Sequence, residues 1–471
     1  MLLVEEGPLK TSSDFKMQEA DAYPELYQEG IGRMSKDGAI TILQGRAVGG
    51  TTLINWTSSF RTPEPTLQHW AQVYGVKGHS AEDMAPWFEK MEQRLHVAPW
   101  ALPPNANNDV IRLGCEKLGY HWKVIPRNVL GCWNLGYCGM GCPVNAKQSM
   151  LVTTIPATLD KGGELLYLAR ANRLLLDGDK VTGLECLGMD ERCVAPNGRR
   201  IRVRARHYVL SGGGINTPAI LLRSKAPDPS QRVGKRTFLH TVISARAVRP
   251  GDRTPSTRTA VDLLRPFPMG RRCHDACPTN WRCRRCNRRW PRAARRFGSD
   301  NACAWNSYRI PTCSSPAPRG FHPDSARARS ACAATTPHAR LPDDRLHPGR
   351  YPPCLPYHGA NPVRRRRPGM RRLHSDGVRE EPAGGARIID ACACEIYRTR
   401  LGSAHVMGGC AMGEDPAVAV ADSLGRHHHL RNLSIHDGSL FPTSIGANPQ
   451  LSVYGLTAQL ASALAERLAR A

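Results

Sequence analysis

Residues 403–416 read SAHVMGGCAMGEDP, and residues 432–450 read NLSIHDGSLFPTSIGANPQ. The first stretch places His405 in a loop rich in glycine and methionine, where the backbone can approach a ligand closely. The apolar run at the start of the second stretch predicts a short strand, which delivers Asp437 and Gly438 to a turn. Two loops that carry polar groups therefore lead into the last part of the chain.

A helix is predicted from the end of the second stretch onward. Asn448 can cap this helix, and Pro449 suits its first turn. Apolar side chains then repeat at helical spacing at Val453, Leu456, Leu460, Leu464 and Leu468. The amino end of the helix would direct free backbone amides, and the positive end of its dipole, at the group that His405 and Asn448 face. An electron-rich group would be stabilised there.

These segments resemble the C-terminal signature of the glucose–methanol–choline (GMC) family of flavin-dependent alcohol oxidoreductases. HVMGGCAMG matches the family's H-x-x-G-[TGS]-C-x-M-G segment, and the resemblance implies that His405 is the catalytic base. It also implies that Asn448 is the second catalytic group, that Asp437 and Gly438 lie along the flavin, and that Pro449 begins a helix facing it. The alternative is an ordinary loop histidine beside a capped helix, but the ordered set of three features favours the functional interpretation.

Residues 39–63, AITILQGRAVGGTTLINWTSSFRTP, contain a second glycine-rich segment. Its glycines allow the backbone to lie against a flat or anionic ligand, and its hydroxyl and amide side chains supply neutral hydrogen bonds. The segment resembles the family's G-R-x-x-G-G-[ST]-[ST]-x-x-N signature, which runs beside the flavin. The residues that this resemblance assigns to the cofactor are Gly45, Arg46, Gly49, Gly50, Thr51, Thr52 and Asn55.

Residues 150–223 predict a helix, then strands, then a turn into another helix. The dipeptide Asp177–Gly178 is typical of a hairpin between two strands. Further on, a strand turns on three glycines and enters a helix after Thr217–Pro218. This part resembles the family's second signature, G-[AG]-x-x-[ST]-P-x-x-L-L-x-S, which implies flavin contacts for Gly213, Gly214, Thr217 and Pro218. The earlier ARANRLL resembles the stretch that packs on adenine, which indicates Ala171.

The chain starts MLLVEEGPLK, which predicts a buried strand that ends in acidic residues. An acid at the tip of the second strand of a dinucleotide-binding βαβ unit accepts hydrogen bonds from ribose. Glu5 fits that place, Glu6 is the neighbour that could replace it, and an exposed strand-end acid is the alternative. A first strand and a G-x-G-x-x-G loop are expected before it, so the sequence is interpreted as truncated at the N-terminus.

The segment GCWNLGYCGMGCPVNAKQSM spaces Cys132, Cys138 and Cys142 as C-x5-C-x3-C. Clustered thiolates in a glycine-rich loop can ligate zinc or an iron–sulfur cluster. Some bacterial sugar dehydrogenases of the GMC family carry a cluster at this place, so an iron–sulfur cluster is one hypothesis. Three reduced thiols packed under the cofactor are the other.

The formal net charge of the 471-residue chain is +25, and most of the excess is local. Residues 251–375 hold 26 arginines and 7 aspartates, with no lysine or glutamate. This segment lacks periodicity and resembles out-of-frame translation of a GC-rich gene, with family-like sequence resuming by about Ile388. Nucleic-acid binding through its arginines is the alternative, and a zinc site at its CRRC pair is disfavoured, because neither has a periodic scaffold.

The predicted fold is α/β, with a Rossmann-like, GMC-type FAD-binding domain and a second, incomplete α+β substrate-binding domain. The expected FAD-binding parts are residues 1–60, 150–245 and 395–471, with a cap portion at 61–149 and a substrate-domain remnant at 246–390. Residues 80–97 predict an amphipathic core helix with a capping box from Ser80 and Asp83.

No apolar run reaches the ~18 residues of a membrane span. Scattered cysteines make a reducing, cytoplasmic compartment the default.

The predicted function is FAD-dependent oxidation of a small-molecule alcohol. His405 takes the hydroxyl proton and hydride passes to the flavin, while the sequence leaves the particular alcohol and the electron acceptor undetermined. No nucleic acid is expected as a partner. Because of the N-terminal and central features, this chain is expected to be impaired. The alternatives are a basic nucleic-acid-binding protein and a non-functional remnant.

Overall fold

The computed structural model describes residues 1–104, 106–240, 242, 245–248, 263–264, 369–372 and 401–470. Its helices and helical turns are η1 (Ser12–Asp14), α1 (Glu19–Leu26), η2 (Gln28–Ile31), η3 (Gly50–Leu53), α2 (Glu64–Tyr74), α3 (Ala81–Arg94), α4 (Ala106–Lys117), α5 (Thr154–Leu159), α6 (Gly213–Arg223), η6 (Gly438–Leu440) and α11 (Gln450–Arg470). Its strands are β1 (Leu2–Val4), β2 (Ile40–Ile42), β3 (Val97–Pro99), β4 (Lys123–Val124), β5 (Pro126–Asn128), β6 (Glu164–Leu166), β7 (Ala169–Asp177), β8 (Lys180–Met189), β9 (Pro196–Val203), β10 (Tyr208–Leu210), β11 (Thr237–Leu239), β12 (Ala245–Val248), β13 (Leu263–Leu264), β14 (Gly369–Arg372), β15 (Leu401–Ser403), β16 (Val406–Gly408) and β17 (Leu433–Ile435).

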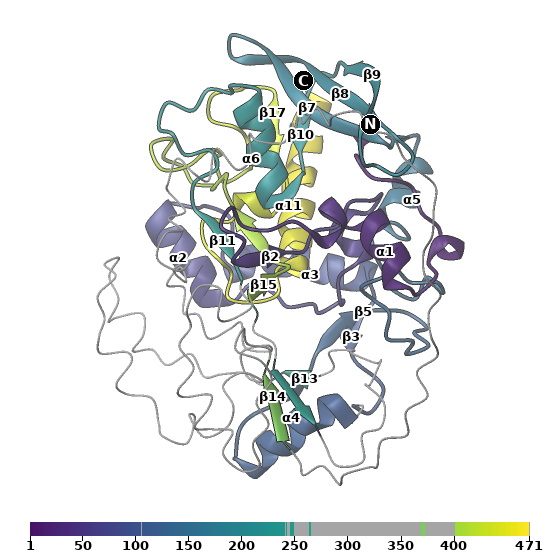
Figure 1. The fold of residues 1–471 in the computed structure, drawn as a ribbon. Helices are drawn as coiled ribbons and strands as arrows, with labels where there is room; N and C mark the ends of the chain where they lie inside the picture. The colour runs from purple at the N-terminus through teal and green to yellow at the C-terminus, as the bar shows by residue number, and fades with distance from the viewer. Residues whose placement is uncertain are drawn as a thin grey trace, which may run out of the picture.

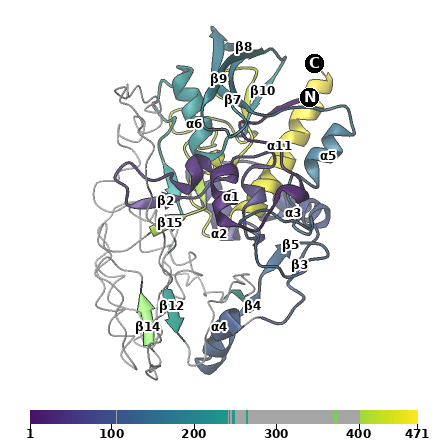
Figure 2. The same cartoon turned by 45° about the vertical axis from the view of Figure 1, so that its right-hand side comes forward.

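In Figure 1, α11 runs down the middle of the view, the β7–β9 sheet lies near its upper end, and α4 lies at the opposite, lower end of the molecule. The turned view in Figure 2 keeps this order. The side chains that α11 buries lie mostly in its first half, at Leu451, Tyr454, Leu456 and Leu460. Leu464 is partly buried and Leu468 is exposed, so the predicted apolar stripe is buried only along part of its length.

Helix α3 packs directly against α11. A Cβ atom at Gly455 of α11 would lie 2.6 Å from Phe88 Cδ1, so only glycine allows the two helices to approach this closely. The start of α3 confirms the predicted capping box: the Asp83 amide donates to Ser80 Oγ at 3.1 Å, and the Ser80 amide donates to Asp83 Oδ2 at 3.0 Å. Local sequence thus fixes where α3 begins, and its apolar face fixes which helix it contacts.

Strands β7, β8 and β9 form one antiparallel sheet in that order. The hairpin predicted at Asp177–Gly178 is confirmed, because Asp177 pairs with Lys180 across the turn. Gly178 has φ of 55°, the left-handed conformation that such a tight turn requires.

Two short strand pairs join parts of the chain that are far apart in sequence. Strand β10 pairs in parallel with β17, with Leu210 opposite Ile435, so both strands end at the same edge. Strand β11 pairs antiparallel with β16, with Leu239 opposite Val406. The residues that follow β10 and β17, and those at the start of β16, are consequently brought together. Ligands of open α/β sheets bind at such carboxyl ends of strands.

Several predictions concern residues outside the described part of the chain. The arginine-rich segment 251–375 is described only at β13 and β14, so its proposed nucleic-acid and zinc sites lie outside the described residues. Strand β14 pairs with β12, and β13 pairs with β4. Among the helices that the structure describes, none has the length and apolar character needed to cross a membrane.

Candidate active site

Asp437 connects the end of β17 to the start of α6. Its buried carboxylate accepts hydrogen bonds at Oδ2 from the Gly213 amide, at 2.8 Å, and from Thr217 Oγ1, at 2.6 Å. Its Oδ1 accepts from the Ser439 amide at 2.7 Å. An acid at a helix N-terminus is favoured by the exposed amides and the dipole. The side chain of Asp437 therefore holds two turns together.

This contact explains a difference from the sequence-based prediction for α6. The helix is predicted to begin after Thr217–Pro218, but it begins at Gly213. Thr217 Oγ1 accepts from the Gly212 amide at 2.9 Å while donating to Asp437, so the first turn receives a cap from a residue remote in sequence. Local propensity cannot reveal such a cap.

The loop of His405 packs directly on the first turn of α6. A Cβ atom at Gly214 would lie 3.0 Å from Val406 Cγ1, and one at Gly409 would lie 3.1 Å from Pro218 Cγ. Gly409 also has φ of 98°, a conformation that other residues rarely adopt. The glycines predicted from the two signatures thus permit the approach of two backbone segments.

The His405 ring is partly buried and contacts a second histidine. Its Nδ1 lies 2.8 Å from Nδ1 of His240, and the ring centroids are 4.8 Å apart with an interplanar angle of 32°. The His405 amide donates to Ser403 Oγ at 3.3 Å. Burial lowers the pKa of His405 to about 4, so the ring is neutral near pH 7 and can accept a proton.

Asn448 lies two residues before the first residue of α11 and is partly buried. The predicted cap differs from the structure, because the helix begins at Gln450 and its first turn closes with the Val453 amide donating to the Pro449 carbonyl at 2.9 Å. Within the described residues, the Asn448 side chain has no hydrogen-bond partner.

Gln450 is a residue that the sequence analysis does not single out. Its Oε1 accepts from Asn55 Nδ2 at 2.5 Å, and its Nε2 donates to the Ser58 carbonyl at 2.8 Å, to Ser59 Oγ at 3.0 Å and to Asn128 Oδ1 at 3.1 Å. Gln450 therefore fastens the start of α11 to the segment that contains Asn55. Nothing in the local pattern distinguishes this glutamine from a solvent-exposed one.

The segment from Gly45 to Asn55 forms a compact turn that includes η3. The Gly45 amide donates to Thr51 Oγ1 at 3.0 Å, and Thr52 Oγ1 donates to the Gly49 carbonyl at 2.5 Å. Gly50 has φ of 56°, and a Cβ atom there would meet no atom of the described residues within 4 Å. The threonine hydroxyls thus stabilise the turn itself.

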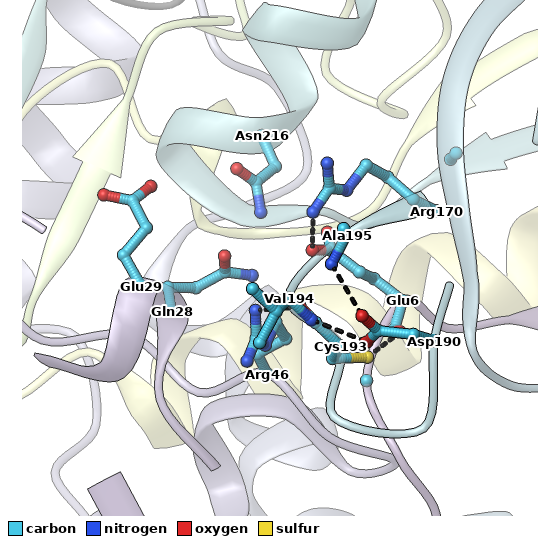
Figure 3. Close-up of polar contacts among 12 residues, drawn as sticks. Glu6, Gln28, Glu29, Arg46, Arg170, Asp190, Cys193, Val194, Ala195 and Asn216 are labelled. Carbon is cyan, nitrogen blue, oxygen red and sulfur yellow. Dashed lines mark hydrogen bonds and ion pairs between the residues drawn. The ribbon is translucent and has the colours of Figure 1, made fainter. Parts of the chain in front are cut away.

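Arg46, the second residue of this segment, lies in a polar cluster with Glu6 and Cys193 (Figure 3). The buried Arg46 guanidinium donates to the Cys193 carbonyl at 2.7 Å and to the Pro24 carbonyl at 3.1 Å. Glu6 Oε1 is paired with Arg170 at 2.9 Å. Arg46 is therefore held by carbonyl groups of the chain.

Glu5 differs from Glu6 in its surroundings. Its Oε1 accepts from the Gly7 amide at 2.7 Å, and burial raises its pKa to about 7 against the opposing charge of Arg46. Its carbonyl accepts from the Ala169 amide at 2.9 Å, two residues before Ala171 on β7. The structure thus brings Glu5, Arg46 and Ala171 to one region, and leaves the Glu5 carboxyl without an ion pair among the described residues.

The three cysteines of the glycine-rich loop do not assemble a metal site. Cys132, Cys138 and Cys142 are all free, and the described residues contain no group of three or more His, Cys, Asp or Glu side chains that could hold a metal ion. Instead, Arg127 donates to Cys138 Sγ at 3.4 Å, and burial raises the pKa of Cys132, which favours the protonated thiol. The iron–sulfur hypothesis is therefore not supported.

A buried lysine stabilises the loop that contains Cys132, Cys138 and Cys142. Lys147 Nζ donates to the carbonyl groups of Leu53, Asn55, at 3.1 Å, and Cys138, at 2.6 Å. Burial lowers the pKa of Lys147 to about 8. Three carbonyl acceptors replace the water that this ammonium group loses, and they tie the cysteine loop to the Gly45–Asn55 turn.

Two family models, both described as GMC oxidoreductase, match residues 23–242 and 361–457. The second match begins at residue 361. Family-like sequence therefore resumes earlier in the chain than Ile388, the position predicted from sequence.

Among curated proteins, a long-chain-alcohol oxidase FAO4B from Arabidopsis thaliana is 30% identical over 52% of this chain and 33% of its own length. The chain thus spans about a third of that plant relative. An uncharacterized GMC-type oxidoreductase, y4nJ, from Sinorhizobium fredii is 24% identical over 98% of this chain and 89% of its own.

Solved structures extend the likeness in fold. Pyridoxine 4-oxidase from Mesorbium loti aligns with a TM-score of 0.55 at 16% identity, covering 98% of this chain and 93% of its own. Formate oxidase aligns with a TM-score of 0.55 at 12% identity, covering 99% and 94%. At these identities the likeness concerns the fold alone, and it confirms the predicted GMC-type α/β organisation.

Proposed function

The chain belongs to the GMC oxidoreductase family of flavoproteins, and from that membership we propose that it oxidises the CH–OH group of an alcohol-type donor with FAD as its cofactor. The observation that carries the proposal is the convergence of four segments. The His405 loop, the turn at Asp437, the first turn of α6 and the start of α11 contact one another through Gly409, Gly214 and Gly438. These are the segments that bear the family signatures.

The residues present fit FAD. Among the described residues, no atom lies within 4 Å of a Cβ position at Gly50, and Gly213 has φ of 80° with Gln44 Nε2 as the atom nearest such a position, at 3.7 Å. Such glycines let a flat or charged cofactor contact the main chain. Glu5 would accept hydrogen bonds from the ribose, and Ala171 would pack on the adenine. FAD, when bound, supplies the acceptor for the hydride that leaves the carbinol carbon.

His405 is the proposed general base and Asn448 the group that orients the alcohol oxygen. A base must be neutral before it can accept the hydroxyl proton, and the lowered pKa of His405 provides this over the neutral pH range. Because the neutral form is lost as the pH falls through about 4, kcat should decline on the acid side of that value and stay level above about pH 6.

The test uses the full chain supplied with FAD and assayed with alcohols of increasing chain length. Long-chain alcohols are the first choice because the plant relatives are named for them. Oxygen and an artificial electron acceptor are supplied in parallel.

His405→Ala should lower kcat by ~10²–10⁴-fold with FAD still bound. His121→Ala, which removes an exposed histidine, is the matched control and should leave kcat unchanged. Near-normal turnover in His405→Ala would rule out the assignment.

A further inference from the structure

We propose that His240 is a positioning residue that determines which ring nitrogen of His405 carries the proton. The inference rests on the proposed role of His405 as the base. It starts from the 2.8 Å contact between the two Nδ1 atoms. Neither the sequence signatures nor the family-model matches assign a role to His240.

The backbone fixes the relative position of the two rings. His240 directly follows β11, and His405 directly precedes β16, so the antiparallel pairing of these strands places the residues opposite each other. The His240 amide also donates to the His405 carbonyl at 3.3 Å. The distance between the rings is thus determined by main-chain pairing and not by rotamer choice alone.

A contact of this length between two neutral imidazoles requires one Nδ1–H group and one bare Nδ1 atom. If His405 donates, its Nε2 is bare and can take a proton from the alcohol. If His240 donates, Nε2 of His405 carries the proton and cannot act as a base. The pair therefore has one arrangement that is competent for catalysis and one that is not.

The burial of His240 determines how it can respond. Its side chain is 1% exposed, and its Nε2 is buried without a hydrogen-bond partner among the described residues. Burial first, and the neighbouring His405 second, keep the pKa of His240 well below its ordinary value. When His405 gains a proton, His240 therefore remains neutral, and in the proposed arrangement its Nδ1 accepts from Nδ1–H of His405 while its own proton stays on the buried Nε2. This is the orienting role that a third group has in a catalytic triad, here without a negative charge.

Among the described residues, the other groups packed near the pair do not offer an alternative proton carrier. The first turn of α6, Gly213–Pro218, contains no ionisable side chain. Asp437 is engaged by the Gly213 amide and Thr217 Oγ1, and Arg236, before β11, lies over the Tyr74 and Phe238 rings. Within the described residues, the two histidines are thus the titratable pair.

The test reads the tautomer directly. The full chain is prepared with ¹⁵N-histidine and FAD, and two-bond ¹⁵N–¹H correlations identify the protonated nitrogen of His405, whose signals are assigned by their loss in His405→Ala. The wild-type protein should show the proton on Nδ1 of His405. His240→Ala should shift His405 toward the Nε2–H form and lower kcat by about 10²-fold with KM little changed, within the range for general-base loss.

His240→Asn provides rescue, because its Oδ1 can accept near the position of the lost Nδ1 and should restore most of kcat and the Nδ1–H tautomer. His79→Asn is the matched control, since His79 is also buried but contacts the Lys77 carbonyl at 2.7 Å. An Nε2–H tautomer in the wild-type protein, or a His405 tautomer unchanged in His240→Ala, would overturn the inference. If His405→Ala keeps its activity, the proposed function fails, and the tautomer measurement still decides whether the pair exists.

Discussion

The amide of Gly213 donates a hydrogen bond to Asp437 Oδ2 at 2.8 Å, although 224 positions separate the two residues in sequence. The contact joins the carboxyl ends of β10 and β17, where the parallel pair opens toward the candidate site. It also lets α6 begin at Gly213, which directs the first turn of that helix at the His405 loop. One carboxylate thus sets the spacing between the segments that carry two family signatures.

Asp437→Asn should destabilise the protein by about 2–4 kcal/mol, because two donors converge on Oδ2 and one on Oδ1, and charge-assisted hydrogen bonds each contribute ~1.5–3 kcal/mol. Thr217→Val should lower stability by ~1–3 kcal/mol by leaving the Gly212 amide unpaired. Urea unfolding measures both. Asp415→Asn, at an exposed turn, should change the free energy of unfolding little. If Asp437→Asn and Asp415→Asn lowered the free energy of unfolding equally, Asp437 would not hold the two turns together as inferred.

Gln450→Leu should destabilise the protein by about 3–5 kcal/mol, since it leaves Asn55, Asn128 and the Ser58 carbonyl without their partner in a partly buried site. Gln459→Leu is the matched control, because Gln459 makes one exposed hydrogen bond to the Gly78 carbonyl. Thermal unfolding monitored by circular dichroism compares the two. A Tm for Gln450→Leu equal to that of the control would show that the network is not structural.

Glu5 should make stability depend on pH in the range between its two pKa values. Burial raises its folded-state pKa from 4.5 to about 7, so the folded protein binds the proton more tightly than the unfolded chain does. This favourable contribution is present below pH 4.5 and is lost as the pH rises through about 7. Glu5→Gln, which stays neutral, should flatten the dependence. Denaturation midpoints from pH 4 to pH 8 check this, and an unchanged slope in the variant would exclude Glu5 as its source.

The features predicted correctly from sequence are those determined by neighbouring residues. Ser80 and Asp83 lie within one turn of helix, and Asp177 and Lys180 flank one hairpin, so short-range hydrogen bonding decides both. The glycine-rich signatures also indicated the segments that converge, because a glycine at a close approach has few substitutes.

The features that sequence reasoning missed depend on pairing between distant segments. The His240–His405 contact spans 165 positions, and Gln450–Asn55 spans 395. Single polar residues at such positions look like surface residues until the strands and helices are placed. The iron–sulfur hypothesis is unsupported for a related reason: thiol spacing along the chain carries no information about Arg127 and Lys147, which surround the loop.

The strand pairs β10–β17, β11–β16 and β2–β15 all join residues before position 240 to residues after position 400. The two flanks of the chain are therefore joined at three places by main-chain hydrogen bonds, so the register between them is written in the backbone and does not require a particular side chain at the paired positions.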